Sequence, residues 1–254
     1  MLNRPVQAAF NRAAEHYDAV ATTQSVVAAR LFELLQLQRL PAPRRILDAG
    51  CGTGGALVSF REAWPASETV ALDFAPAMLA AAGKSAVSVC GNLERLPIRN
   101  CSIDLYWSSL AIQWCELSRA VAEAVRVLRP GGTLAVTTLS VLTFAELRAA
   151  FAGIDSYGHT LEFLEPDAIE AEIRRGGFAQ LSRSRLMVTE HHQDLRTLLR
   201  RVKATGANQI SGRRRPGLLG RHAFAEAERR YEAFRAAEGL PLPYDVVMII
   251  ARRS

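Results

Sequence analysis

Apolar and polar positions recur along this chain with two different periods, and their order predicts an α/β protein. From Asn3 to Leu40 the apolar positions follow helical spacing, and those at Val27, Leu31, Leu34 and Leu35 fit an amphipathic helix. We expect two helical segments here that meet near residues 21–24. Prolines at positions 41 and 43 end this region, because proline cannot continue a helix.

Short apolar runs bounded by turn residues follow, and we interpret them as strands of one sheet. They lie at Arg45–Gly50, Val70–Asp73, Ser88–Gly91, Ile103–Ser108 and Thr133–Leu139, with two later ones near Ser182–Val188 and Asp245–Ala251. Helical patterns at Pro76–Ala82 and Ser118–Leu128 separate some of them. Strands that alternate with helices predict a single domain over residues 1–254, with a seven-stranded, mostly parallel sheet and helices on both faces.

Residues 190–243 lie between the last two predicted strands. An interval of this length exceeds a hairpin loop, so we expect a helical insertion before the last strand. Within it, Leu195–Ala225 holds eight Arg and Lys residues and no acidic residue, whereas the whole chain has a net charge of +6. This local positive charge favours an acidic partner on one face, and an ordinary solvated helix face is the alternative.

Several classes of protein are disfavoured by what the chain lacks. No apolar stretch reaches the roughly 18 residues of a membrane span, and charged residues interrupt the first twenty positions, so no signal peptide is expected. The four cysteines form no C-x-x-C pair, which argues against a zinc site. We therefore expect a cytoplasmic protein with no bound metal and no membrane partner.

The strongest motif is the glycine-rich segment that follows the first predicted strand. Its spacing is G-x-G-x-G, formed by Gly50, Gly52 and Gly54, with Asp48 two residues before the first glycine. Glycines at a strand end allow a tight turn and a close approach of the backbone to a ligand. The combination resembles the first motif of class I methyltransferases, although nicotinamide-dependent enzymes also use a G-x-G element.

Three further segments extend the resemblance to class I methyltransferases. Asp73 ends the second predicted strand, where a carboxylate can accept hydrogen bonds from both ribose hydroxyls. The resemblance implies that Asn92 contacts the adenine amine, that Leu93 holds the adenine ring and that Ser108 lies in the cofactor site. Arg129–Gly132, before the fifth strand, also matches the class. It thus implies a Rossmann-like fold with a cofactor-binding core at residues 45–140 and S-adenosylmethionine as the cofactor.

A narrower resemblance covers nearly the whole chain. The segments that carry it are Phe10–Asp18, Trp107–Ser108, Leu110–Cys115, Thr137–Leu139, Val202–Ala207 and Leu240–Tyr244. In them the chain is similar to the enzymes that methylate the free carboxyl group of malonyl-acyl carrier protein in biotin synthesis. The resemblance implies a malonyl group on acyl carrier protein, or on coenzyme A, as the substrate. It also implies an N-terminal helical lid over residues 1–40.

The resemblance gives roles to individual residues. Tyr17 is the candidate catalytic residue on the lid, and Gln113, Trp114 and Tyr244 are candidates for contact with the substrate or its carrier. The departures from the family pattern are Ser109 in place of the common Asn, Glu162 where relatives can carry Arg, and Pro243 in place of Thr. An arginine at position 162 would be a natural partner for the substrate carboxylate.

The basic window is the expected docking surface for the acidic carrier protein. Arg196, Arg200 and Lys203 lie at i, i+4 and i+7 on one helix face, next to Arg201, and Arg213–Arg215 could extend the same surface. Nucleic acid is not expected as a substrate, because Asn or Asp followed by Pro-Pro is missing after the fourth predicted strand.

Two other functions are compatible with the same motifs. A methyltransferase for a free small carboxylic acid or a quinone-type phenol would keep the cofactor site and leave the basic window to solvent. A non-catalytic binding protein of this fold is disfavoured, because the cofactor motifs are intact.

Overall fold

The computed structural model describes residues 4–154, 157, 160–204 and 219–254, and its strands form one sheet. They are β1 (Arg45–Ala49), β2 (Glu68–Asp73), β3 (Val87–Cys90), β4 (Ile103–Ser109), β5 (Leu128–Leu139), β6 (Phe178–His192) and β7 (Leu240–Arg253). Each of the seven overlaps one of the segments that the sequence pattern predicted as strands. The predicted α/β fold with a seven-stranded sheet is therefore confirmed.

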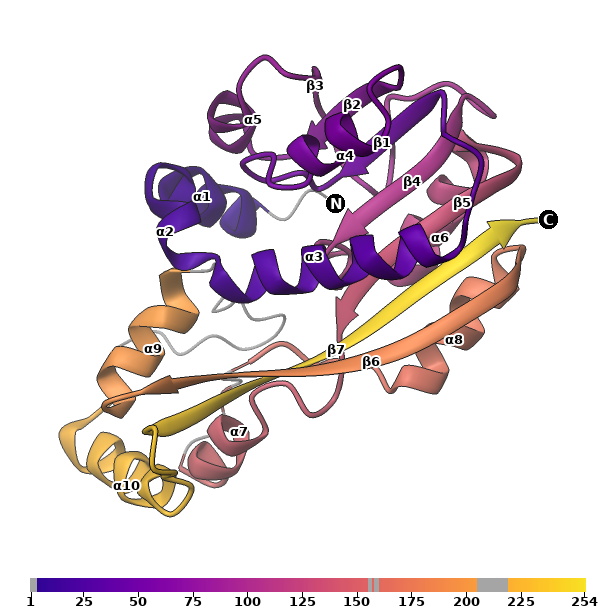
Figure 1. Ribbon diagram of the computed structural model, residues 1–254. Helices are drawn as coiled ribbons and strands as arrows, with labels where there is room; N and C mark the ends of the chain where they lie inside the picture. The colour runs from indigo at the N-terminus through magenta and orange to yellow at the C-terminus, as the bar shows by residue number, and fades with distance from the viewer. Residues whose placement is uncertain (1–3, 155–156, 158–159, 205–218) are drawn as a thin grey trace.

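The strand order is β3-β2-β1-β4-β5-β7-β6. The first five strands are parallel, and β7 runs antiparallel between β5 and β6. In register, Leu47 of β1 lies beside Val70 of β2 and Tyr106 of β4, so β1 is central (Figure 1). The order of strands reverses between β1 and β4, and open α/β sheets bind ligands at the carboxyl ends of strands at such a point.

Helices cover both faces of the sheet (Figure 1). In chain order they are α1 (Arg4–Ala13), the 3₁₀ turn η1 (Ala14–His16), α2 (Tyr17–Val20), α3 (Thr22–Leu37), α4 (Leu57–Ala63), α5 (Pro76–Ala82), the 3₁₀ turn η2 (Ile112–Trp114), α6 (Leu117–Val127), α7 (Ala145–Phe151), α8 (Pro166–Arg175), α9 (Leu195–Ala204) and α10 (Arg221–Glu232). None of the helices in the described ranges is long and apolar enough to cross a membrane.

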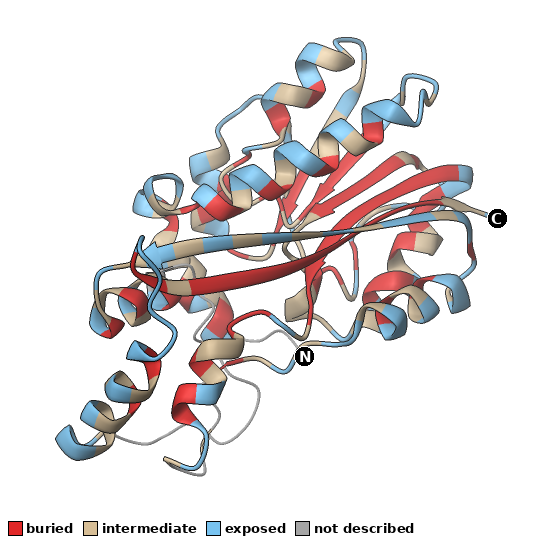
Figure 2. Cartoon of the chain, turned by 60° about the horizontal axis from the view of Figure 1, so that its bottom comes forward, coloured by how far each residue is buried: buried red, intermediate tan, exposed pale blue. Residues whose placement is uncertain are grey.

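Side-chain alternation along the strands creates two apolar layers. Trp107 of β4 belongs to the layer under α3 and α4, with Leu31 and Phe60, whereas its neighbour Tyr106 belongs to the opposite layer under α6 and α8, with Val121. Figure 2 shows that β7 is buried over most of its length while β6 is largely exposed. The sheet is therefore covered on both faces, and β6 is its solvent-facing edge.

The N-terminal region is helical, as predicted, and α3 begins at Thr22, close to the expected break. A second interruption, the turn η1, separates α1 from α2. The amphipathic α1 lies against α5, with Val6 and Ala9 buried. Residues 4–20 therefore cross the carboxyl edge of the sheet before α3 packs across β4 and β5 (Figure 1).

Strands β6 and β7 are longer than the sequence pattern predicted. Their pairing runs from Phe178 opposite Arg253 to His192 opposite Leu240. Because β6 is an edge strand, its outward positions are polar, so an apolar pattern marks only its middle. The extended pair projects beyond the parallel strands and carries α9 and α10 at its far end (Figure 1). The helical insertion is thus confirmed, but it starts after β6 rather than at residue 190.

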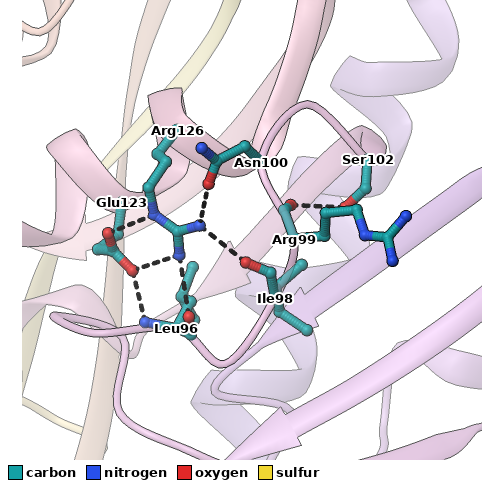
Figure 3. A network of polar contacts seen from close by, with 7 residues as sticks. All are labelled: Leu96, Ile98, Arg99, Asn100, Ser102, Glu123 and Arg126. Atoms are coloured by element: carbon teal, nitrogen blue, oxygen red, sulfur yellow. Dashed lines mark hydrogen bonds and ion pairs between the residues drawn. The ribbon is translucent and has the colours of Figure 1, made fainter.

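A polar network around Arg126 holds the segment that follows β3 (Figure 3). The Arg126 guanidinium donates to the carbonyl oxygens of Leu96 at 2.9 Å and Ile98 at 2.8 Å, and to Glu123 Oε1 at 2.7 Å. Glu123 also accepts the amide of Leu96 at 2.5 Å. The hydrogen bond from Arg126 is the main reason that the pKa of Glu123 lies below its usual range. The ion pair between Glu123 and Arg126 of α6 therefore holds the loop that leads from β3 to β4 in place.

We predict that Arg126→Met lowers the free energy of unfolding by about 1–3 kcal/mol, because several charge-assisted hydrogen bonds are lost together at a half-buried site. Arg119→Met is the matched control on the same helix, since it breaks only the exposed pair with Glu116 and should cost less than about 1 kcal/mol. Urea unfolding followed by circular dichroism measures both. Equal losses in the two variants would contradict the role given to Arg126.

Candidate functional site

The glycine-rich turn after β1 is anchored to the end of β2. The amides of Gly50 and Cys51 both donate to the carbonyl oxygen of Leu72, at 2.7 and 2.9 Å. Asp73 Oδ2 accepts the amide of Gly52 at 3.0 Å, and Asp73 Oδ1 accepts the amide of Ala75 at 2.8 Å. Burial raises the pKa of Asp73, although these amide hydrogen bonds act in the opposite direction. The predicted ribose ligand therefore also builds the turn.

Glycine is required in this turn for two different reasons. Gly50 and Gly52 have φ values of +80° and +54°, which L side chains rarely adopt. A Cβ on Gly50 would lie 2.4 Å from the Ala111 side chain. Gly54, which was predicted to bind the cofactor, lines neither of the cavities described below. A Cβ there would lie 2.9 Å from Leu57 and 3.1 Å from Ala82, so Gly54 serves the packing of α5.

Two cavities meet at Tyr17, above the carboxyl edge of the sheet. The first is lined by Asp73, Phe74, Met78, Asn92, Leu93 and Trp114. The second lies between the glycine-rich turn and α3. Tyr17, Gly50, Gly52 and Ser109 line both, so the two cavities adjoin at the turn.

Lid residues close the first cavity from above. Phe10 packs edge-on against Trp114, with ring centroids 5.6 Å apart, and lies 6.3 Å from the Tyr17 ring. Leu93 is buried below them, and the Asn92 side chain accepts the amide of Glu94 at 2.9 Å. Asn92 and Leu93, assigned to the cofactor, and Trp114, assigned to the substrate or its carrier, thus line one cavity. Phe10 completes this apolar slot, although only its place in a resembling segment marked it.

The second cavity contains two buried acceptors without partners among the described residues. They are Asp48 Oδ2 and Gln24 Oε1, and both residues line this cavity. Burial, and then the charge of Asp73, raise the pKa of Asp48 to about 8. Buried polar atoms are costly unless they are paired. The cavity therefore suits a ligand with a positively charged donor.

Three hydrogen bonds tie the lid to the core. Asp18 accepts the Thr53 hydroxyl at 2.5 Å, which joins α2 to the glycine-rich turn. Asn11 accepts the amide of Ala77 at 3.0 Å, in the first turn of α5, and the Gln7 side chain donates to the Phe74 carbonyl oxygen at 2.5 Å. Because Gln7 and Asn11 precede Tyr17 in the chain and Asp18 follows it, these hydrogen bonds hold Tyr17 in place over both cavities.

Burial raises the pKa of Tyr17 to about 12, and the charges of Asp73 and Asp18 add to this effect. Its hydroxyl therefore keeps its proton at neutral pH. Tyr17 lines both cavities, and its catalytic role stays a prediction.

Two further residues that were predicted to contact ligands line neither of these cavities. Ser108 is fully buried and its hydroxyl donates to the carbonyl oxygen of Ala49 at 2.8 Å, so it ties β1 to β4 and lines neither cavity. Strand alternation places Ser109 at the cavities instead. Gln113 also lines neither cavity; its side chain donates to the carbonyl oxygen of Leu110 at 2.6 Å and supports the turn before Trp114.

The basic residues of α9, which were predicted to form one docking face, fall into an exposed group and one largely buried residue. Arg196, Arg200 and Lys203 are exposed, in agreement with their helical spacing. Arg201 was grouped with them, but only 14% of its side chain is exposed, and it points to the interior. The reason is geometric, since Arg201 lies about 100° around the helix from Arg200. Arg213–Arg215 lie outside the described residues.

Arg201 belongs to a polar network that the sequence analysis did not identify. Its Nε and Nη2 donate to Glu190 of β6 at 2.7 and 2.8 Å, and Glu190 accepts the Thr23 hydroxyl of α3 at 2.6 Å. Burial opposes ionisation of Glu190, but the bonds from Arg201 and Thr23 hold its pKa below the usual range. The network joins the insertion, the edge strand and the lid-bearing helix. Glu162, in contrast, is exposed.

Tyr244 of β7 lies beside this network. Its ring packs edge-on against Phe144 at 5.0 Å, and only 2% of the residue is exposed. The hydroxyl is buried and has no hydrogen-bond partner within the described ranges. Tyr17 and Arg201 both lie within electrostatic range of Tyr244.

Comparisons with known proteins agree with this geometry. Residues 47–136 match the methyltransferase domain family. A solved S-adenosylmethionine-dependent methyltransferase from Thermotoga maritima shares the fold, with a TM-score of 0.58 and 18% identity over 98% of this chain and 100% of that chain. The biotin biosynthesis bifunctional protein of Cellvibrio japonicus is 35% identical over 96% of this chain and 49% of that protein.

One full-length relative extends the similarity to the lid and the insertion. The malonyl-acyl-carrier-protein O-methyltransferase of Dechloromonas aromatica is 44% identical over 250 residues, which cover 98% of this chain and 94% of the relative. Similarity of this extent includes the residues that flank both cavities as well as the core. The chain therefore belongs to the family of malonyl-acyl-carrier-protein O-methyltransferases.

Proposed function

We propose that this protein transfers a methyl group from S-adenosylmethionine to the terminal carboxylate of malonyl-acyl carrier protein, an early step of biotin synthesis. The observation that carries the proposal is the similarity to the relative named for this activity, which spans lid, core and insertion rather than the core alone. The paired cavities at the carboxyl edge of the sheet support it, since open α/β sheets bind their ligands at this edge.

The residues present fit S-adenosylmethionine. The first cavity would hold the adenosine half, with Asp73 facing the ribose hydroxyls and Leu93 against the adenine ring. In the second cavity, the unpartnered oxygens of Asp48 and Gln24 would accept hydrogen bonds from the α-ammonium group. That ammonium removes the cost of two unpaired buried acceptors, which is a physical reason for both residues to face the cavity.

The protein's task in this reaction is alignment. When bound, the cofactor would supply an electrophilic methyl group: the carboxylate oxygen would form a bond to the methyl carbon, and the electron pair of the broken carbon–sulfur bond would stay on sulfur, which leaves as a neutral thioether. A malonyl carboxylate is ionised at pH 7, because carboxyl pKa values lie near about 4, so no residue has to remove a proton. Tyr17 and the lid would hold the reacting groups together and exclude water, which accounts for much of such a rate enhancement.

The exposed cations of α9 would receive the carrier protein. Arg196, Arg200 and Lys203 form a basic face next to the lid, because α9 contacts α2. An acidic carrier that docks there could extend its acyl arm towards Tyr17. Opposite charges on two surfaces speed association and select the partner more than they strengthen the final complex.

We predict that Asp48→Asn and Asp73→Asn weaken cofactor binding in different ways. Asp48→Asn should weaken S-adenosylhomocysteine by about tenfold or more, because a charge-assisted hydrogen bond contributes roughly 1.5–3 kcal/mol. It should leave methylthioadenosine, which lacks the amino-acid end, nearly unaffected. Asp73→Asn should weaken both ligands. Calorimetric titration measures the four constants, and equal losses of both ligands in Asp48→Asn would refute the assignment of the ammonium site.

The raised pKa of Asp48 predicts a pH-dependent stability. A carboxyl whose folded pKa is raised to about 8 stabilises the fold at low pH, and this contribution is lost as the pH rises towards 8. Asp48→Asn should therefore gain stability relative to the ligand-free wild type between pH 5 and pH 8. Urea unfolding at several pH values tests this. Asp167→Asn, whose side chain is 89% exposed, controls for the loss of one charge and should show no such trend.

Charge reversal on α9 should affect the carrier-bound substrate selectively. We predict that Arg200→Glu with Lys203→Glu raises the Michaelis constant for malonyl-acyl carrier protein by roughly tenfold, about 1–2 kcal/mol for two exposed sites, and that salt produces a similar effect. The constant for malonyl-coenzyme A should change much less. Arg174→Glu with Arg175→Glu on α8 is the matched control, since both are exposed and lie on a different helix. Equal effects of the two double variants would remove α9 from carrier recognition.

A further inference from the structure

Ser109 lies at the junction of the two cavities. It is the last residue of β4, is half-buried and lines both cavities, as do Tyr17 and two glycines of the turn. In the proposed mode of cofactor binding, the first cavity holds the adenosine half and the second holds the amino-acid half. The side chains that line both cavities therefore lie beside the atoms at which these halves join, which are the sulfur and its methyl group.

The segment that follows Ser109 is held between β5 and the glycine-rich turn. Leu110 has a φ of +48°, a conformation that is costly for a residue with a side chain. Its amide donates to Thr137 at two points, the hydroxyl at 2.9 Å and the carbonyl oxygen at 3.3 Å. The Ala111 side chain lies so close to the turn that a Cβ on Gly50 would be 2.4 Å from it. These contacts fix the place of the Ser109 side chain at the junction.

The hydrogen bonds of Thr137 decide where the hydrogen of the Ser109 hydroxyl points. Thr137 of β5 is the register partner of Ser109 and is fully buried, with its hydroxyl oxygen 3.3 Å from that of Ser109. A buried hydroxyl normally donates its single hydrogen to an acceptor. The Leu110 amide is itself a donor, so Ser109 Oγ is the acceptor that the described residues offer to Thr137. The hydrogen of Ser109 is therefore left to point into the cavities.

A neutral donor at this point suits an anionic methyl acceptor. The sulfur of the bound cofactor is positively charged and accepts no hydrogen bond, so it cannot satisfy a donor that lies beside it. An incoming carboxylate can accept this hydrogen through one oxygen while its other oxygen faces the methyl group. Because a hydroxyl carries no charge, it orients the carboxylate without neutralising the charge that makes it a nucleophile.

We propose that the Ser109 hydroxyl, oriented by Thr137, donates to one oxygen of the carboxylate that accepts the methyl group. Ser109 keeps its proton throughout, since the carboxylate arrives ionised and the ester forms without proton transfer. The hydrogen bond is stronger to a carboxylate than to an uncharged ester oxygen, so Ser109 favours the substrate over the product. This inference rests on the proposed function and deepens it, because it names a residue that recognises the reacting group.

The first test uses Ser109→Ala, which removes one oxygen at the junction. We expect the Michaelis constant for malonyl-coenzyme A to rise about tenfold, the effect of one hydrogen bond to a charged group. The dissociation constant of S-adenosylhomocysteine should stay unchanged. Ser108→Ala is the matched control, because it removes the same hydroxyl from the preceding residue of β4, which lines neither cavity. A wild-type Michaelis constant in Ser109→Ala, or an equal loss of S-adenosylhomocysteine affinity, overturns the proposal.

Thr137 acts through Ser109 and is tested as a positioning residue. Thr137→Val keeps the shape of the side chain and removes the hydroxyl that orients Ser109. We expect a smaller rise in the same Michaelis constant, and no further rise when Thr137→Val is added to Ser109→Ala, because the two hydroxyls act as one unit. Thr137→Ser, which keeps the hydroxyl, should restore the wild-type constant. Additive effects of the two substitutions would contradict the role given to Thr137.

Binding measurements separate this proposal from the proposed function. If the wild type methylates no malonyl thioester, the proposed function fails, and calorimetry then tests Ser109 by itself. Malonyl-coenzyme A and acetyl-coenzyme A, which lacks the carboxylate, are titrated into the wild type and Ser109→Ala, each saturated with S-adenosylhomocysteine. A wild-type preference for the malonyl compound that Ser109→Ala abolishes supports the proposal. Equal affinity of the wild type for both compounds, or a preference that Ser109→Ala retains, overturns it.

Discussion

The hydrogen bonds between the end of β2 and the glycine-rich turn are the constraint on which the site depends. Leu72 and Asp73 accept amides from Gly50, Cys51 and Gly52, so the turn cannot move independently of the sheet. The positive φ values of Gly50 and Gly52 allow this arrangement, because a side chain at either position would strain the backbone. Both cavities have this turn as their common floor.

The lid lies over the glycine-rich turn. Asp18 of the lid is hydrogen bonded to Thr53 of the turn, and Asn11 is hydrogen bonded to the first turn of α5. The Tyr17 ring consequently lies 3.9 Å from the position that a Cβ on Gly52 would take. The cofactor would thus be enclosed between a rigid floor and a lid that a few hydrogen bonds hold.

The long β6–β7 pair extends the site to a third part of the chain. It carries α9 past the edge of the parallel sheet, so one face of this helix meets solvent while the other, through Arg201, meets Glu190. Neighbouring residues on one helix therefore have different surroundings, solvent for Arg200 and the Glu190 carboxylate for Arg201.

Periodicity and motif spacing were sufficient to predict the succession of strands and the glycine-rich turn after β1, whereas the cofactor site and the lid were implied by the family resemblance. These features depend on local sequence: glycines at positions 50 and 52, an acid at the end of β2 and apolar runs at strand spacing. Patterns were less informative for β6, because the outer side of an edge strand is polar and carries no apolar signal beyond its middle.

Only the tertiary structure decided which side chains meet. The network of Thr23, Glu190 and Arg201 joins residues 167 and 11 positions apart, and no local pattern links them. The same is true of Ser108, which the sequence placed in the cofactor site and the fold directs to Ala49. Sequence fixes the face of an element on which a residue lies, whereas packing against distant elements determines what that face contacts.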